Sequence, residues 1–127
     1  MDNVQYPHSG ITEKIISSAI EVHKALGPGL LESVYEEALA HEFDLRKIKY
    51  TRQEAVSLQY KGKEVGHHRP DFLVEDQVVL EVKAAEGMPK IFEAQLLTYL
   101  NATAKKVGLI INFNVVLLKE GIKRLVL

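Results

Sequence analysis

The chain has 127 residues, of which 46% are apolar and 26% are charged, with a formal net charge of −1 and no cysteine. This length is typical of one domain with a single core, and the lack of cysteine excludes disulfides, thiolate metal sites and cysteine nucleophiles. The balanced charge provides no global positive field of the kind that marks many nucleic-acid-binding proteins, so local patches would have to hold such a partner.

The N-terminus lacks the apolar core of a secretory signal, and no apolar run approaches the roughly 18 residues of a membrane helix. We therefore expect a cytoplasmic protein without a membrane partner. Residues 1–10 are predicted to form a flexible arm, and residues 11–127 a single domain.

Two helices are expected first. Ser9 or Thr12 can cap a helix with apolar residues at helical spacing, and the segment Gly27-Pro28-Gly29 ends it. A second helix with its own apolar stripe is expected over about 30–46.

The middle of the chain has the alternation and the turn residues of strands. Strands are predicted over residues 50–60, near 64–66, and over 69–74 and 78–84. A third helix is expected over about 88–102, then a covered strand over 106–111 and a terminal hairpin of 115–118 with 122–127. The predicted order is αα-βββ(β)-α-ββ.

Two acids and a lysine stand where paired strands would bring them together. Pro70-Asp71 is followed, after nine residues, by Glu81-Val82-Lys83. Glu81 and Lys83 are two apart and therefore share one face of a strand. A turn at 75–77 would bring Asp71 beside Glu81, where both could bind one divalent cation with Lys83 close by, as in phosphodiesterases. The alternative is that Glu81 is an edge-strand acid paired with Lys83 or an arginine.

Three helical residues also break the local pattern. Glu32 lies at the flank of the second helix's apolar stripe, and Gln95 and Tyr99 lie on the stripe of the third helix, one turn apart. Each has a structural alternative. Glu32 would suit a helix N-terminus because of the macrodipole, and Gln95 and Tyr99 could be satisfied core residues.

Adjacent histidines, His67 and His68, point in opposite directions on a strand, so one of them is expected near the cleft and the other in solvent. The P-loop, GxGxxG, HExxH and nucleophile-elbow motifs are absent from the sequence. A serine hydrolase is therefore not expected.

Taken together, these residues resemble the PD-(D/E)xK nuclease superfamily, and within it the small GxxExxY family, whose name is spelled by GLLESVY at 29–35. Further similar blocks extend over nearly the whole chain: LGPGLLESVYEEAL (26–39), RPDFLVEDQVVLEVKA (69–84), AQLLTYL (94–100), VGLIINF (107–113) and GIKRLVL (121–127). The resemblance implies an α/β, restriction-endonuclease-like core, with a mixed central sheet flanked by helices.

The same resemblance implies roles for individual residues. Asp71, Glu81 and the Val82 carbonyl would bind Mg²⁺ or Mn²⁺, and Lys83 would be the catalytic lysine. Glu32 matches the acid that many members carry on the first core helix, where it would complete the metal shell. Gln95 and Tyr99 match a QxxxY pattern, and would position a phosphate or the lysine. One departure from the family's pattern is Phe92, where related sequences often carry histidine.

The leading hypothesis is therefore a metal-dependent nuclease acting on DNA or RNA. The alternatives are a catalytically silent binding module that keeps the nuclease fold, and a hydrolase of nucleotides or another phosphoester. Exposed terminal strands would also allow a homodimer.

Overall fold

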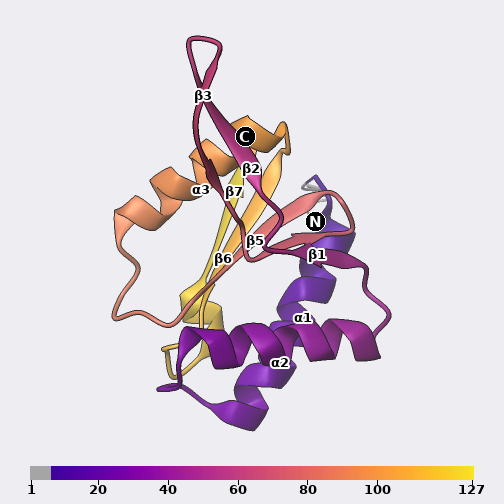
Figure 1. Cartoon of the computed structure of the whole chain (residues 1–127). Helices are drawn as coiled ribbons and strands as arrows, with labels where there is room; N and C mark the ends of the chain where they lie inside the picture. Colours follow the sequence, from indigo (N-terminus) through magenta and orange to yellow (C-terminus); the bar gives the residue numbers. More distant parts are fainter. Residues whose placement is uncertain (1–6) are drawn as a thin grey trace, which may run out of the picture.

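The structure is a computed structural model, and it describes residues 7–127 (Figure 1). In chain order its elements are α1 (Ser9–Leu26), α2 (Glu32–Leu45), β1 (Tyr50–Arg52), β2 (Val56–Tyr60), β3 (Lys63–His68), β4 (Phe72–Val74), β5 (Val78–Lys83), α3 (Lys90–Thr103), β6 (Val107–Asn112), the 3₁₀ helix η1 (Leu118–Gly121) and β7 (Ile122–Val126). Most of the flexible arm expected over 1–10 lies outside the described residues, and Ser9 and Gly10 already belong to α1.

The described residues form a five-stranded sheet with strand order β1-β4-β5-β6-β7. β5 and β6 are parallel, while the other neighbouring strands are antiparallel. The helices cover both faces of the central strands, and the side chains of β6 are all buried. The fold therefore confirms the predicted mixed sheet flanked by helices, in a restriction-endonuclease-like arrangement.

Two apolar layers hold the sheet between the helices. The larger layer lies between the sheet and helices α1 and α2, and it contains Val78, Leu80 and Val82 of β5. The smaller layer contains Val79 together with Leu96 and Leu100 of α3. Because side chains alternate along a strand, Glu81 and Lys83 lie on the same face as Val79, toward α3.

The strand predicted over 50–60 is wrong as a single element. It breaks at Gln53, which has a left-handed backbone with φ of 55°. The Gln53 N–H donates to the carbonyl of Pro70 at 3.1 Å, so the chain turns there instead of extending. β1 pairs with β4, whereas β2 pairs with β3 in a separate hairpin. The strand expected from residue 69 likewise begins only at Phe72.

The terminal hairpin of 115–118 with 122–127 is also wrong. β7 pairs with β6 instead, starting from Ile122 opposite Ile111. The carbonyl of Val115 is bonded to the His23 ring on α1, with 2.8 Å between Val115 O and His23 Nε2. This contact holds the connection against α1, and η1 then returns the chain to β6. A Cβ at Gly121 would lie 2.1 Å from the Asn112 carbonyl oxygen, so only glycine fits this return.

The β2–β3 hairpin projects beyond the rest of the molecule (Figure 1). It is a two-stranded sheet of its own, β2 packs on α3, and Val56 and Leu58 of β2 are half-buried. The two turn residues, Lys61 and Gly62, have φ values of 48° and 83°. Positive φ at both positions matches the twist that a tight hairpin requires.

Candidate functional site

The two predicted acids meet where β4 begins and β5 ends. Phe72 pairs with Leu80, so the next step of the antiparallel ladder brings Asp71 beside Glu81. The Asp71 N–H donates to Glu81 Oε1 at 3.3 Å, and the Val82 N–H donates to Asp71 Oδ2 at 2.7 Å. Glu81 is buried and Asp71 is half-buried. The PD and ExK segments therefore form one local structure.

The carbonyl of Val82 faces the same edge of β5 as Asp71. The N–H and carbonyl of one strand residue point to the same side of the strand, and successive residues alternate. The Val82 N–H points to Asp71, whereas the Lys83 carbonyl accepts a hydrogen bond from the Phe113 N–H (2.9 Å), on the side of β6. This edge therefore presents the Val82 carbonyl oxygen beside two carboxyl groups.

Both carboxyl groups are harder to ionise than an exposed acid. Burial raises the pKa of Asp71 from 3.8 to about 6, and the charges of Glu36 and Glu32 add to the increase. Burial and the charge of Asp71 raise the pKa of Glu81 from 4.5 to about 8. The positive charge of Lys83 opposes the increase in both pKa values. Ionising both acids therefore costs more here than at an exposed position, in the absence of a further cation.

Lys83 lies on the α3 face of the sheet. Its Nζ is 4.6 Å from the centroid of the Phe92 ring, so an aromatic face holds the ammonium group beside the acids. The family departure at Phe92 thus has a structural consequence, because this ring contacts the predicted catalytic lysine.

Of the two adjacent histidines, His68 enters the site and His67 is exposed. The rings of His68 and Tyr99 are stacked, with centroids 3.4 Å apart and planes inclined by 6°. His68 Nε2 is shielded from solvent, has no hydrogen-bond partner among the described residues and lies 3.6 Å from Glu81 Oε1. Burial, followed by the charge of Lys83, lowers the pKa of His68. The neutral imidazole is therefore favoured.

The remaining helical candidates lie at the margin of the site. Glu32 is exposed at the start of α2, near enough for its charge to raise the pKa values of both site acids. Gln95 is exposed on α3, and its side chain makes no hydrogen bond to the described residues. Within residues 7–127, no three His, Asp or Glu side chains converge closely enough to form a metal site by themselves.

Gln53 and Glu36 belong to the site, although the sequence analysis did not identify them. Gln53 Nε2 donates to Glu36 Oε1 and to Asp71 Oδ1, both at 3.1 Å. Arg52 Nη2 also binds Glu36 Oε1, at 3.0 Å. The amide thus separates two carboxylates that would otherwise repel each other. The only local signal was a polar pair inside a predicted strand, and it does not reveal the left-handed turn that aims Gln53 at Asp71.

The GLLESVY segment positions the start of α2. The Tyr35 hydroxyl is buried, donates to the Gly27 carbonyl (2.6 Å) and accepts from the Leu30 N–H (3.1 Å). Its ring stacks on Phe113 with centroids 4.6 Å apart. Gly29 has φ of 94°, which glycine adopts readily. The glycine and the tyrosine of this segment therefore fix the turn from which Glu32 projects.

The loop after Lys83 is fixed by one buried side chain. Asn112 Nδ2 donates to the carbonyls of Ala85 (2.9 Å) and Gly87 (2.7 Å), and Asn112 Oδ1 accepts from the Ala85 N–H (3.0 Å). This connection leads to α3, which carries Phe92 and Tyr99. Asn112 therefore stabilises the path that places both rings over the site.

A family model of the PD-(D/E)XK nuclease superfamily matches residues 9–125. The chain belongs to the PD-(D/E)XK nuclease superfamily. No curated protein and no solved structure matches it. Within the matched range, Pro70-Asp71 has the letters of the PD of the superfamily's name, and Glu81-Val82-Lys83 has those of its ExK.

Nucleases of this superfamily generally use divalent metals, and the donors of this PD-(D/E)XK domain fit such an ion. Carboxylate and carbonyl oxygens are the ligands preferred by Mg²⁺ and Mn²⁺. Mg²⁺ is usually bound by only one or two carboxylates and keeps several waters, so a third convergent acid is not required. Burial, and for Glu81 also the charge of Asp71, disfavours the ionised forms and raises both pKa values, and a nearby cation would act in the opposite direction.

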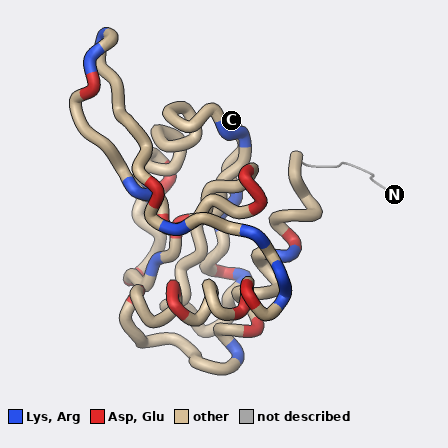
Figure 2. The backbone as a smooth tube through the Cα atoms, turned by 45° about the vertical axis from the view of Figure 1, so that its right-hand side comes forward, with Lys and Arg blue, Asp and Glu red and all other residues tan. Residues whose placement is uncertain are grey.

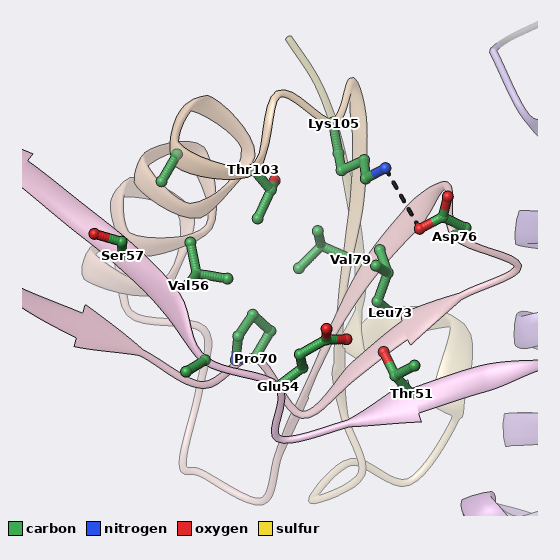
Figure 3. A pocket seen from close by; sticks show the side chains of 12 residues that line it. Thr51, Glu54, Val56, Ser57, Pro70, Leu73, Asp76, Val79, Thr103 and Lys105 are labelled. Carbon is green, nitrogen blue, oxygen red and sulfur yellow. Dashed lines mark ion pairs between the residues drawn. The ribbon is translucent and has the colours of Figure 1, made fainter.

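A separate pocket of about 320 Å³ adjoins the domain's site without including its acids (Figure 3). It lies between the base of the hairpin, the sheet and the end of α3, and its lining includes Val56, Pro70, Leu73, Val79, Thr103 and Lys105. An ion pair from Lys105 Nζ to Asp76 Oδ1 (3.6 Å) borders it.

None of the helices in the described part of the chain is long and apolar enough to span a membrane.

Proposed function

We propose that this domain is a Mg²⁺- or Mn²⁺-dependent nuclease that hydrolyses phosphodiester bonds of DNA or RNA, and that it belongs to the GxxExxY group within the superfamily. One observation carries the proposal. Asp71 and Glu81 are joined through backbone hydrogen bonds at the end of β5, with Lys83 on the same strand face as Glu81. In a chance pair of surface acids, we would not expect one member to be buried, the other half-buried, and both fixed to the backbone.

Asp71, Glu81 and the Val82 carbonyl would hold the cation. When bound, the cation would polarise the phosphoryl group and make water a stronger nucleophile near neutral pH. Asp71 is oriented for binding by the N–H of Val82, and Gln53 holds its other oxygen. These contacts keep the carboxylate in place before the ion arrives.

Lys83 would stabilise the negative charge that develops on the phosphoryl oxygens. Its ammonium rests against the Phe92 ring, which limits its motion without neutralising it. Tyr99 would act as a positioning residue, through the stack that holds His68 near Glu81. Glu32 and Gln95 stay predictions, one for the outer metal shell and the other for a contact to the substrate phosphate.

The decisive experiment compares cleavage by wild type, Lys83→Ala and Lys14→Ala. Single- and double-stranded DNA and RNA are incubated with each protein in Mn²⁺ and in Mg²⁺. We expect cleavage by wild type and by Lys14→Ala, whose lysine is exposed on α1, and a loss of at least about 100-fold in Lys83→Ala, as for removal of an electrostatic transition-state contact. Equal cleavage by wild type and Lys83→Ala would contradict the proposal.

Thermal stability separates the nuclease from a catalytically silent module. Mn²⁺ should raise the melting temperature of wild type, because it binds only the folded arrangement of Asp71 and Glu81. The increase should vanish in Asp71→Asn and persist in Asp76→Asn, whose carboxyl lies in the β4–β5 turn. An identical increase in Asp71→Asn would favour the silent module.

The homodimer stays a prediction, which the sedimentation velocity of the same proteins tests.

A further inference from the structure

The β2–β3 hairpin has two faces with different chemistry. Residues directly opposite in the ladder share a face, and so do alternate residues along β2. The face that begins with Val56 and His68 at the base ends with Tyr60 and Lys63 at the tip. The β-bulge after Leu58 keeps Glu64 opposite Gln59, on the other face.

The base of this face packs against α3, whereas its tip is exposed to solvent. His68 stacks on Tyr99, and β2 packs on α3. The Tyr60 side chain is 62% exposed. Lys61 Nζ lies 5.4 Å from the centroid of the Tyr60 ring, so a cation and an aromatic ring are held together at the tip.

The hairpin tip is positive in a chain that is slightly acidic overall. The tip carries Lys61 and Lys63 with one acid, Glu64, and Figure 2 shows blue at the end of the projection with red beside it. Neither Lys61 nor Lys63 forms an ion pair with any residue the structure describes, whereas Arg52, Arg46 and Lys123 of the body are bound to glutamates. Because the site itself concentrates acids, a polyanionic substrate needs attraction from elsewhere.

We propose that the β2–β3 hairpin is an arm that binds single-stranded nucleic acid, with Lys61 and Lys63 on its phosphates and the Tyr60 ring against a base. Charge complementarity supports this partner, and an exposed ring beside cations is the usual combination in single-strand recognition. The proposal rests on the nuclease function proposed above, because it names the substrate class of that site. His68 at the base of the arm lies at the catalytic acids, so a bound strand would run from the tip to the site.

The length of β3 sets the reach of the arm. Five residue steps separate Lys63 from His68, which is about 16 Å at about 3.3 Å per residue. With about 3.4 Å per stacked nucleotide, the lysines would contact phosphates about five nucleotides from the bond that is cut. An oligonucleotide shorter than about five nucleotides cannot contact the arm and the site at the same time.

The test is fluorescence anisotropy of labelled oligonucleotides over a range of salt concentrations, without divalent metal so that no cleavage occurs. The variant is Lys61→Asn with Lys63→Gln, since asparagine tolerates the positive φ at position 61. The matched control is Lys14→Gln with Lys24→Gln on α1, which removes the same charge from two exposed lysines. On a 12-nucleotide strand we expect the arm variant to bind about tenfold more weakly. The plot of log K against log salt should also become less steep, by about 0.7 per lysine removed. The control should leave both quantities unchanged.

A second variant separates stacking from charge. Tyr60→Ala should weaken single-strand binding about fivefold or more, with an unchanged salt slope, and should not weaken duplex binding. An unchanged affinity of the arm variant for the long strand, a wild type that binds no nucleic acid, or an arm variant with a changed sedimentation coefficient in the absence of nucleic acid would each overturn the proposal. The last result would instead indicate a protein interface between copies.

Failure of this inference can be told apart from failure of the proposed function. Binding that depends on the arm, combined with no cleavage and no Mn²⁺ stabilisation, would leave the arm intact and remove the nuclease. Cleavage that depends on Lys83 but not on Lys61 and Lys63 would support the nuclease and contradict the arm.

Discussion

The imidazole of His68 lies face to face with the ring of Tyr99, with the ring centroids 3.4 Å apart. This stack joins the base of the hairpin to α3, directly beside Glu81. Together with the packing of β2 on α3, it fixes the base of the hairpin at the site. It also distinguishes His68 from its neighbour His67, which is exposed.

We predict that His68→Ala destabilises the protein, whereas His67→Ala does not. Loss of an aromatic pair typically costs about 0.5–1.5 kcal/mol beyond the buried area, so the free energy of unfolding should fall by about that amount. Chemical denaturation measures it, and the near-ultraviolet circular dichroism of tyrosine should change in parallel. Tyr99→Phe keeps a ring for the stack and should remain stable, whereas Tyr99→Ala should resemble His68→Ala. Equal effects of the two histidine variants would contradict the role of the stack.

The two site acids should make the metal-free protein less stable as the pH rises. Burial raises the pKa of Asp71 from 3.8 to about 6 and that of Glu81 from 4.5 to about 8. A carboxyl group whose pKa is higher in the folded state binds more protons there, so the free energy of unfolding decreases with rising pH between the two pKa values. The stability that the protonated forms of Asp71 and Glu81 contribute is therefore lost as the pH rises from 3.8 to about 8.

Glu81→Gln should remove most of this penalty, because it keeps the size of the side chain and removes the charge. Without divalent metal, we expect its gain in unfolding free energy over wild type to be about 4 kcal/mol larger at pH 8.5 than at pH 5. Glu64→Gln, at an exposed position on β3, should show no such pH dependence. Mn²⁺ at pH 8.5 should stabilise wild type and not Glu81→Gln. A gain that is the same at both pH values would argue against a raised pKa of Glu81.

The sequence was sufficient to predict the strand that carries Glu81 and Lys83, but not the turns around it. The apolar run of β5 with Glu81 and Lys83 at period two required one strand face to carry both, and the structure has this arrangement. His67 and His68 could not be distinguished, because the phase of a strand with two polar faces depends on what packs against it. The breaks at Gln53 and at Val115 depend on bonds to the Pro70 carbonyl and the His23 ring, which lie far away in the sequence.

Gln53 should contribute more to stability when Asp71 is ionised. Its amide donates to both Asp71 and Glu36, and hydrogen bonds to a charged acceptor are stronger than those to a neutral one. Since the pKa of Asp71 is about 6, Gln53→Ala should lower the free energy of unfolding by about 1–2 kcal/mol at pH 8 and by less at pH 5. Gln59→Ala, which removes another exposed glutamine with one side-chain bond, is the control. A pH-independent loss in Gln53→Ala would indicate a backbone effect instead.

Tyr35→Phe should destabilise the protein although it retains the stacked ring. The hydroxyl is the partner of both the Gly27 carbonyl and the Leu30 N–H, so its removal leaves two backbone groups unsatisfied at the turn before α2. We expect the free energy of unfolding to fall by about 1–3 kcal/mol, because each of the two hydrogen bonds typically contributes about 0.5–1.5 kcal/mol. Tyr60→Phe, at the exposed hairpin tip, should have no effect on stability.

Because the same turn positions Glu32, Tyr35→Phe should also weaken any contribution of Glu32 to Mn²⁺ binding. Titration of Mn²⁺ against Tyr35→Phe and Glu32→Gln tests this, and additive losses in the double variant would show that the two residues act independently.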